Sequence, residues 1–318
     1  MLNKIILAGI ILITFSACGG VAIVPSRAGN LEFFIGAETP EAAANGLEFA
    51  DGTQSIADAE AREIQIKLAR FVRDPTTGET RIVLSDETVT LPVTFTDYGD
   101  RDIAVTLDGE TLTFVDGEAT LSSGQSLWSY MNYKMVHSGT GAIYTYGQYN
   151  EGIDDPLDME GFFAFGFETN PNQIATLSGS ATYTGSYFGY VQTFDLDGSL
   201  TASGLRTIGA INMETDFSEA HVSGRLTGWI DPDGDDTEYE LIFLGAPIVG
   251  NGFVGSADIT CPAGASCTSE TYVGGAFFGE NGAEISGVIG IDETVAGPGD
   301  DQGYQFVGAA GFSSAIDE

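Results

Sequence analysis

The chain has 318 residues, and its 46 acidic against 11 basic side chains give a formal net charge of −35. This balance argues against nucleic acid as a partner, because binding to phosphates needs clustered Lys and Arg. Apolar residues make up 43% of the chain and charged residues only 18%, which argues against a disordered acidic tail and predicts a folded core. With 43 glycines and many aromatic and β-branched residues, the composition predicts an all-β fold.

The N-terminal segment predicts export and lipid attachment. Lys4 precedes an apolar run over residues 5–15, too short to span a bilayer as a helix, and Ser16-Ala17-Cys18 follows. This pattern resembles a bacterial lipoprotein signal, in which the cysteine is acylated; an ordinary signal peptide with a chance cysteine is the alternative. We predict a signal peptide over residues 1–17, a palmitate-type anchor on Cys18 and a lipidated tether over residues 18–30. Gly19 after the cysteine resembles lipoproteins carried to the outer membrane.

Alternating apolar residues predict strands in the next segment. Ile64, Ile66 and Leu68 share one face of a predicted strand, and residues 88–96 alternate in the same way. Short strands are predicted over residues 103–107, 111–115 and 118–121, joined by Asp-Gly turns typical of hairpins. Short helical turns are predicted at 39–44 and 55–63. Together these elements predict a β-rich domain over residues 31–172.

Tyrosine and tryptophan side chains crowd the end of this domain. Such side chains combine a large contact area with a polar group, so they are favoured at interfaces. Two interpretations stay open, namely contact with a partner and packing against the domain that follows. The residues are Trp128, Tyr130, Tyr133, Tyr144, Tyr146 and Tyr149.

Residues 151–318 are more acidic than the preceding part of the chain, with 27 acidic and 2 basic residues. Eight strands separated by regular turns, without helices, predict a closed eight-stranded antiparallel β-barrel over residues 173–318. Glycines inside these strands fit the sharp coiling of a small barrel. The predicted strands cover residues 179–190, 206–213, 221–230, 238–244, 252–260, 270–279, 284–291 and 303–312.

The two remaining cysteines, Cys261 and Cys267, predict a disulfide. An even number of cysteines in an exported chain is typical of a disulfide, and the five residues between these two include Pro262 and Gly264, which favour a turn. A metal site is the alternative, but two thiols without a nearby histidine provide too few ligands for a closed zinc site.

Two further motifs have weaker interpretations. Residues 231–236 concentrate carboxylates that could bind Ca²⁺ or could form a solvated hairpin tip; the loop lacks the spacing of an EF-hand. Residues 250–255 fit the dinucleotide fingerprint by chance, because a predicted strand and a turn follow rather than a helix. The candidate calcium ligands are Asp231, Asp233, Asp235 and Asp236.

Four motifs rich in glycine and aromatic residues follow one another in the second half: SGSATYTGSYFGY, METDFSEAHVSGRLTG, GGAFFGENGAEISGVIG and GYQFVGAAGF. In this order they resemble the β-barrel domain of transferrin-binding protein B, and of related surface lipoproteins such as factor H-binding protein. The resemblance implies a lipid-anchored surface protein with a handle domain before the barrel, here residues 31–172. The matching positions are Ala181, Tyr183 and Gly185; Asp216, Phe217 and Gly224; Gly274, Gly275, Phe277 and Gly279; and Gly282, Ala283, Glu284 and Gly287.

No nucleophile–base pair or catalytic motif accompanies the two histidines, His137 and His221, so we predict no enzyme and no cofactor. Some relatives of this barrel handle haem, so either histidine is a candidate axial ligand, but no second matched ligand accompanies it. The sequence therefore predicts a monomeric, non-catalytic lipoprotein on the bacterial outer-membrane surface. It would bind a protein or a small solute, in iron or haem acquisition. The alternative is a structural or adhesive envelope lipoprotein without a specific ligand.

Overall fold

The computed structural model describes the strands, with gaps at several loops. The described residues are 35–41, 43–44, 46–56, 63–73, 80–90, 104–107, 110–115, 118–120, 126–132, 135–145, 161–196, 200–230, 237–260, 266–296 and 303–317. The predicted signal peptide, Cys18 and the tether predicted over residues 18–30 lie outside them.

The described part of the chain forms strands almost throughout, and we call β1–β9 the handle and β10–β18 the barrel. The handle strands are β1 (Gly46–Phe49), β2 (Glu63–Arg73), β3 (Thr80–Thr90), β4 (Ala104–Leu107), β5 (Glu110–Thr113), β6 (Glu118–Thr120), β7 (Ser126–Asn132), β8 (Ser138–Thr145) and β9 (Gly161–Glu168). A one-turn helix, α1 (Pro171–Ile174), leads to the barrel strands. These are β10 (Ser180–Asp195), β11 (Leu200–Asp216), β12 (His221–Ile230), β13 (Thr237–Val249), β14 (Gly252–Ile259), β15 (Ser266–Ser269), β16 (Thr271–Phe278), β17 (Glu284–Ala296) and β18 (Gly303–Ile316), with a 3-10 turn η3 (Glu280–Gly282) before β17.

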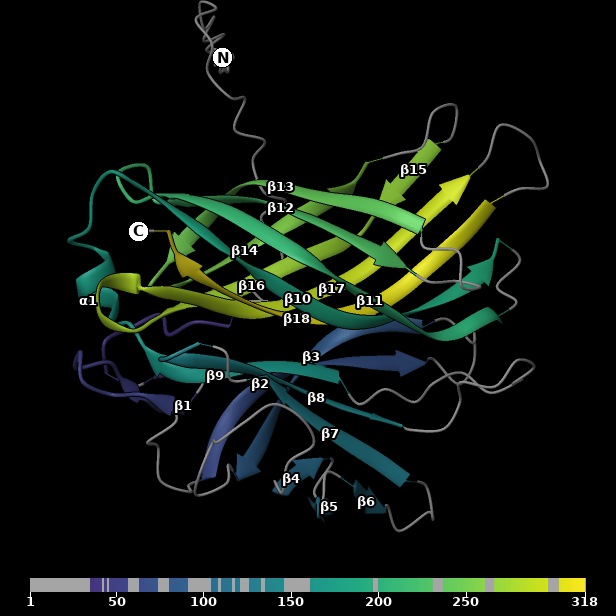
Figure 1. Ribbon diagram of the computed structural model, residues 1–318, viewed down its shortest axis with the longest axis horizontal. Helices are drawn as coiled ribbons and strands as arrows, with labels where there is room; N and C mark the ends of the chain where they lie inside the picture. The colour runs from purple at the N-terminus through teal and green to yellow at the C-terminus, as the bar shows by residue number, and fades with distance from the viewer. Residues whose placement is uncertain are drawn as a thin grey trace, which may run out of the picture.

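The barrel is closed, antiparallel and eight-stranded, as the sequence predicts. Consecutive strands pair from β10 to β14 and from β16 to β18, and β14 pairs with β16. β18 returns to pair with β10, from Tyr183 opposite Ile316 to Asp195 opposite Tyr304. β15 and β16 act as one strand, because both pair with β17 in the same register across Glu270. In Figure 1 the barrel lies above the handle, with α1 at one end of the barrel and β15 at the other.

Alternating side chains fill the barrel interior. Along β17, for example, Ile285, Ile289 and Ile291 point into one apolar cluster that also takes residues from the other barrel strands. Aromatic side chains from three of the family motifs meet at the α1 end. The ring of Phe277 lies 6.2 Å from that of Tyr183 and 5.6 Å from that of Phe217. The residues that carry the resemblance therefore pack together inside the barrel.

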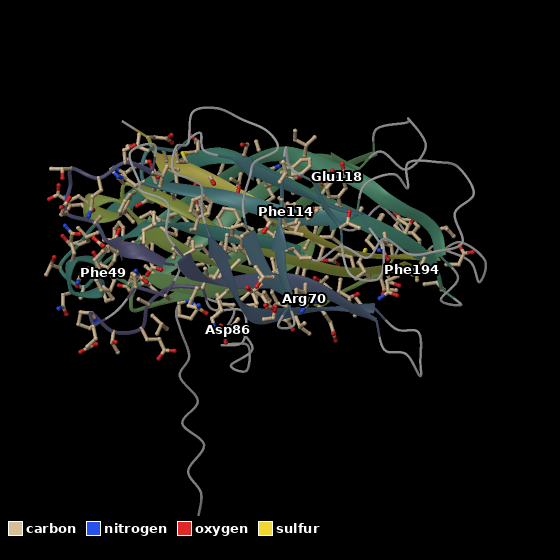
Figure 2. The ribbon with its side chains drawn as sticks, turned by 90° about the horizontal axis from the view of Figure 1, so that it is seen from below. Phe49, Arg70, Asp86, Phe114, Glu118 and Phe194 are labelled. Carbon is tan, nitrogen blue, oxygen red and sulfur yellow. The ribbon has the colours of Figure 1, made fainter. Side chains whose placement is uncertain are left out.

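The handle has its own core beneath the barrel. The predicted alternation in β2 is confirmed, since Ile64, Ile66 and Leu68 are all buried in that core. The predicted short strands at β4, β5 and β6 are also present. Two ion pairs join β2 to β3, Lys67 with Asp86 and Arg70 with Glu87, and Figure 2 labels one residue of each.

The helical turn predicted at residues 39–44 does not form; the described residues there are turns and bends. The chain just before it is fixed against the barrel, because the Ala37 carbonyl accepts a hydrogen bond from the Asn251 amide at 3.0 Å. Gly46 already begins β1, which pairs with β9. Most of the turn predicted at 55–63 lies outside the described residues.

No helix within the described part of the chain is both long and apolar enough to cross a bilayer.

Candidate functional site

The handle packs on one side of the barrel through an apolar layer, which we call the junction. Phe162 and Ala142 on the handle meet Val288 and Ala309 on the barrel in one buried cluster. The Phe162 ring also lies 6.3 Å from that of Phe188, in an edge-on arrangement. β9 is buried along its whole length, since one face lines the handle core and the other lines the junction.

A buried carboxyl group crosses the junction beside this layer. Glu284, the first residue of β17, is only 4% exposed. Its side chain accepts hydrogen bonds from the Val136 amide at 2.8 Å and from the His137 amide at 3.0 Å. The Ser138 hydroxyl donates a further bond at 2.8 Å. A barrel carboxyl group thus satisfies three donors at the start of β8, so neither partner is left unpaired by burial.

Hydroxyl groups extend this contact into the barrel. The buried Ser138 hydroxyl lies 2.8 Å from that of Ser286, which lies 3.0 Å from that of Ser313. Beside them, His137 Nδ1 donates to the Gln54 carbonyl at 2.8 Å, because a carbonyl can only accept. The His137 ring therefore forms a structural hydrogen bond at the junction.

A second polar contact joins the two parts through Asn251. Its side chain is fully buried, and its Oδ1 accepts from the Ala37 amide at 2.5 Å. Its Nδ2 donates to Glu168 at 2.9 Å and to the Thr169 carbonyl at 2.7 Å. Asn251 lies in the Gly-Asn-Gly turn before β14, so the apparent dinucleotide motif is a turn that carries a buried contact to the handle.

Glycine is required where the backbones approach at the junction. Gly279 has a φ of +75°, and a Cβ there would lie 2.5 Å from the His137 ring. Gly166, with a φ of +156°, would place a Cβ against the His137 carbonyl. Both positions combine a conformation that favours glycine with close contact to the same histidine.

The predicted site residues are only partly described. Cys267 is disulfide-bonded, and Cys261 lies outside the described residues, so their pairing stays a prediction. Asp231, Asp233, Asp235 and Asp236 also lie outside them. Within the part of the chain that is described, no group of three or more His, Cys, Asp or Glu side chains could hold a metal ion.

The aromatic residues proposed as partner contacts are described only in part. The backbone of β7 and β8 pairs Trp128 with Tyr144, and Tyr130 with the buried Ala142. The side chains of these three aromatic residues, and all of Tyr133, Tyr146 and Tyr149, lie outside the described residues. Their role, in partner contact or in packing, stays a prediction.

Sequence reasoning did not find Glu284 or Asn251 as junction residues. Glu284 stood inside a family motif, but its partners lie almost 150 positions earlier in the chain. Asn251 was hidden in a motif interpreted as chance. An asparagine between two glycines in a turn was the available signal, because it can offer both a donor and an acceptor at one point.

An eight-stranded barrel with a strand-rich handle on one side defines the class of this protein. The family model described as the C-lobe and N-lobe β-barrels of Tf-binding protein B matches residues 176–311. That segment is a transferrin-binding protein B-like barrel domain, and it covers β10–β17 and most of β18. None of the curated proteins matches the chain.

Solved structures of transferrin-binding protein B are similar to this chain. A mutant of the protein from Haemophilus parasuis Hp5 has 16% identity and a TM-score of 0.41, covering 80% of this chain and 45% of that one. The isotype 1 protein from serogroup B Neisseria meningitidis has 15% identity and a TM-score of 0.40, covering 80% and 43%. The chain therefore spans less than half the length of these structures.

Proposed function

We propose that this protein is a lipid-anchored lipoprotein of the bacterial cell surface that binds a protein ligand and catalyses no reaction. The observation that carries the proposal is the match of residues 176–311 to the barrels of a protein named for binding transferrin. The cysteine after Ser16-Ala17 supports the anchor, because acylation at that position would hold the folded part at the membrane surface.

The ligand class follows from the same match. A transferrin, or another protein of iron acquisition, is the first candidate, and haem is the second. The acidic chain favours a ligand with a basic surface, since like charges across an interface would oppose association.

A binding measurement on residues 19–318, a form without the predicted signal peptide and anchor cysteine, tests this function. The immobilised protein would be exposed to iron-loaded transferrin, iron-free transferrin, haemin and, as a control, serum albumin. We expect saturable binding of one transferrin form or of haemin, and none of albumin. Failure of all three probes would remove the role in iron acquisition and favour the structural or adhesive alternative.

Substitutions in the aromatic set would locate the contact. If Tyr146 and Tyr149 touch the ligand, Tyr146→Ala and Tyr149→Ala should each weaken binding about tenfold without lowering the melting temperature. If they pack inside the protein, the melting temperature should fall first. Tyr304→Phe, at a barrel strand, is a control that keeps the ring.

The anchor has its own test. A fatty-acid probe should label the full chain in cells, and Cys18→Ser should abolish the label. Equal labelling of the variant would remove the anchor from the proposal and leave the binding function to be judged on its own measurement.

A further inference from the structure

A carboxyl group that forms no ion pair with any described residue lies inside the barrel at the end away from α1. Glu293 on β17 is only 1% exposed and is opposite Ser269 on β15 and Phe306 on β18. Its Oε1 lies 2.6 Å from the Ser269 hydroxyl oxygen. Its Oε2 has no hydrogen-bond partner among the described residues.

The Ser269 hydroxyl has two neighbours that compete for its single hydrogen. It lies 2.6 Å from the Ala257 carbonyl and 2.6 Å from Glu293 Oε1. A carbonyl can only accept, and a hydroxyl has one hydrogen to donate. Both short contacts are satisfied together only if Glu293 carries the proton and donates to Ser269, which then donates to Ala257.

This hydroxyl joins two strands where the regular pairing stops. The paired residues of β14 and β16 end at Ala257 and Thr271, and β15 pairs instead with β17. The bond from Ser269 to the Ala257 carbonyl therefore ties β15 to β14 beyond the end of that ladder. Cys267, which is disulfide-bonded, precedes Ser269 by two residues on the same strand.

The surroundings favour the neutral acid. The pKa of Glu293 is raised to about 7, and burial is the largest cause. Hydrogen bonds from the Ser269 and Thr271 hydroxyls lower it in part, and the carboxylates of Asp258 on β14 and Asp292 on β17 contribute a smaller increase. Glu270 follows β15, and Tyr304 on β18 has a pKa that burial also raises. β14 to β18 contain no Lys or Arg among their described residues.

We propose that Glu293 is a proton-controlled latch on the barrel: as a neutral acid it lets Ser269 hold β15 to β14, and its ionisation releases that contact. The charged carboxylate would compete with Ala257 for the one hydroxyl hydrogen, so the tie between the strands would be lost. The segment that loosens leads directly from the predicted disulfide loop at residues 261–267. This inference does not depend on the proposed ligand.

The direction of the pH effect follows from proton linkage. The folded pKa lies above the ordinary value of 4.5, so the folded protein holds an extra proton between these values. Stability from this group is therefore complete below about pH 4.5 and is lost as the pH rises through about 7. From this group alone, the ratio of unfolded to folded protein should rise on the order of a hundredfold across that window.

Two measurements on residues 19–318 test the latch. A carbon-13 NMR titration, with the signal assigned by its loss in Glu293→Gln, should show Glu293 titrating near pH 7. Amide hydrogen exchange, corrected for the intrinsic pH dependence of exchange, should rise in residues 266–271 between pH 6 and pH 8.5. The exchange measurement uses the unaltered sequence alone, so it does not depend on a variant that folds.

Variants then separate the latch from general charge effects. Glu293→Gln should abolish the rise in exchange, because the glutamine amide donates to Ser269 at every pH. Ser269→Ala should give fast exchange at both pH values, and Glu214→Gln, an exposed control on β11, should behave like the unaltered protein. Titration of Glu293 near pH 4.5, or equal protection of residues 266–271 at both pH values, would overturn the proposal.

Discussion

Strand β17 carries a buried glutamate near each end, Glu284 at the handle and Glu293 about 30 Å further along the strand. Glu284 is 4% exposed and Glu293 is 1% exposed, so burial does not distinguish them. Their hydrogen-bond donors do. Glu284 accepts from two backbone amides and a serine hydroxyl of the handle. Glu293 has only hydroxyls near it, and one of them is shared with a carbonyl.

The contrast shows how donors determine what a buried acid does. Amide donors stabilise a carboxyl group as an acceptor, so Glu284 joins the handle to the barrel. Without such donors the neutral form is favoured, so the contact at Glu293 depends on pH. The end of the barrel at Glu284 is therefore joined to the handle, whereas the contact between β15 and β14 at the other end depends on the protonation of Glu293.

The largest expected effect comes from removing the handle. Residues 173–318 alone should still fold, because the barrel closes its own edges. Val288, Ala309 and Phe188 would become exposed, and Glu284 would lose its amide donors. We expect a cooperative β-sheet protein that self-associates, as judged by circular dichroism, denaturant titration and light scattering. A featureless coil spectrum would mean that the two parts fold only together.

Truncating Glu284 should destabilise the whole chain strongly. Glu284→Ala removes the side-chain acceptor of the partly buried Val136 and His137 amides, and it leaves the buried Ser138 hydroxyl with Ser286 alone. We expect a loss of about 4 kcal/mol in the free energy of unfolding, measured in urea at pH 7. Glu214→Ala, on an exposed position of β11, should change it by less than about 0.5 kcal/mol. Similar losses in the two variants would contradict the role of Glu284.

Removing the second polar contact should have a smaller effect. Asn251→Ala deletes one acceptor and one donor that reach Ala37, Glu168 and Thr169. The free energy of unfolding should fall by about 3 kcal/mol. The exposed Asn212 on β11 gives a matched control, Asn212→Ala. Hydrogen exchange should increase at the Ala37 amide, and unchanged protection there would show that Asn251 does not hold that segment.

The same substitution at the two glutamates should have opposite signs. At pH 8, Glu284→Gln turns an amide donor toward other donors and should cost about 2 kcal/mol of stability. Glu293→Gln removes a buried charge and should add about 2 kcal/mol at that pH, with little change at pH 4.5. Parallel urea titrations of both variants measure this directly. A loss of stability in both at pH 8 would show that the two sites do not differ in the way described.

Much of the barrel could be predicted from the sequence, because hairpins and alternation are local. The strand predicted at residues 221–230 has the same bounds as β12. β9 was not predicted, because Gly161 to Glu168 is buried on both faces and shows no alternation.

The polar sites could not be predicted, because their chemistry depends on distant partners. Glu284 takes its donors from residues 136–138, which only the packing of handle on barrel brings near. Glu293 stands in the sequence Ile-Asp-Glu-Thr, where it resembles a solvated strand residue beside Asp292. The register of β17 against β15 and β18 decides that Glu293, rather than Asp292, faces the barrel interior.

Under the proposed function, the folded chain is displayed on a bacterial surface to bind a ligand. Intact cells that produce the full chain should bind the probe that the purified protein selects, and protease added outside should remove both the protein and the binding. Cys18→Ser should release the protein from the cells and abolish cell-associated binding, while the released protein still binds. Full protection from external protease, with the barrel folded and the lipid attached, would contradict surface display.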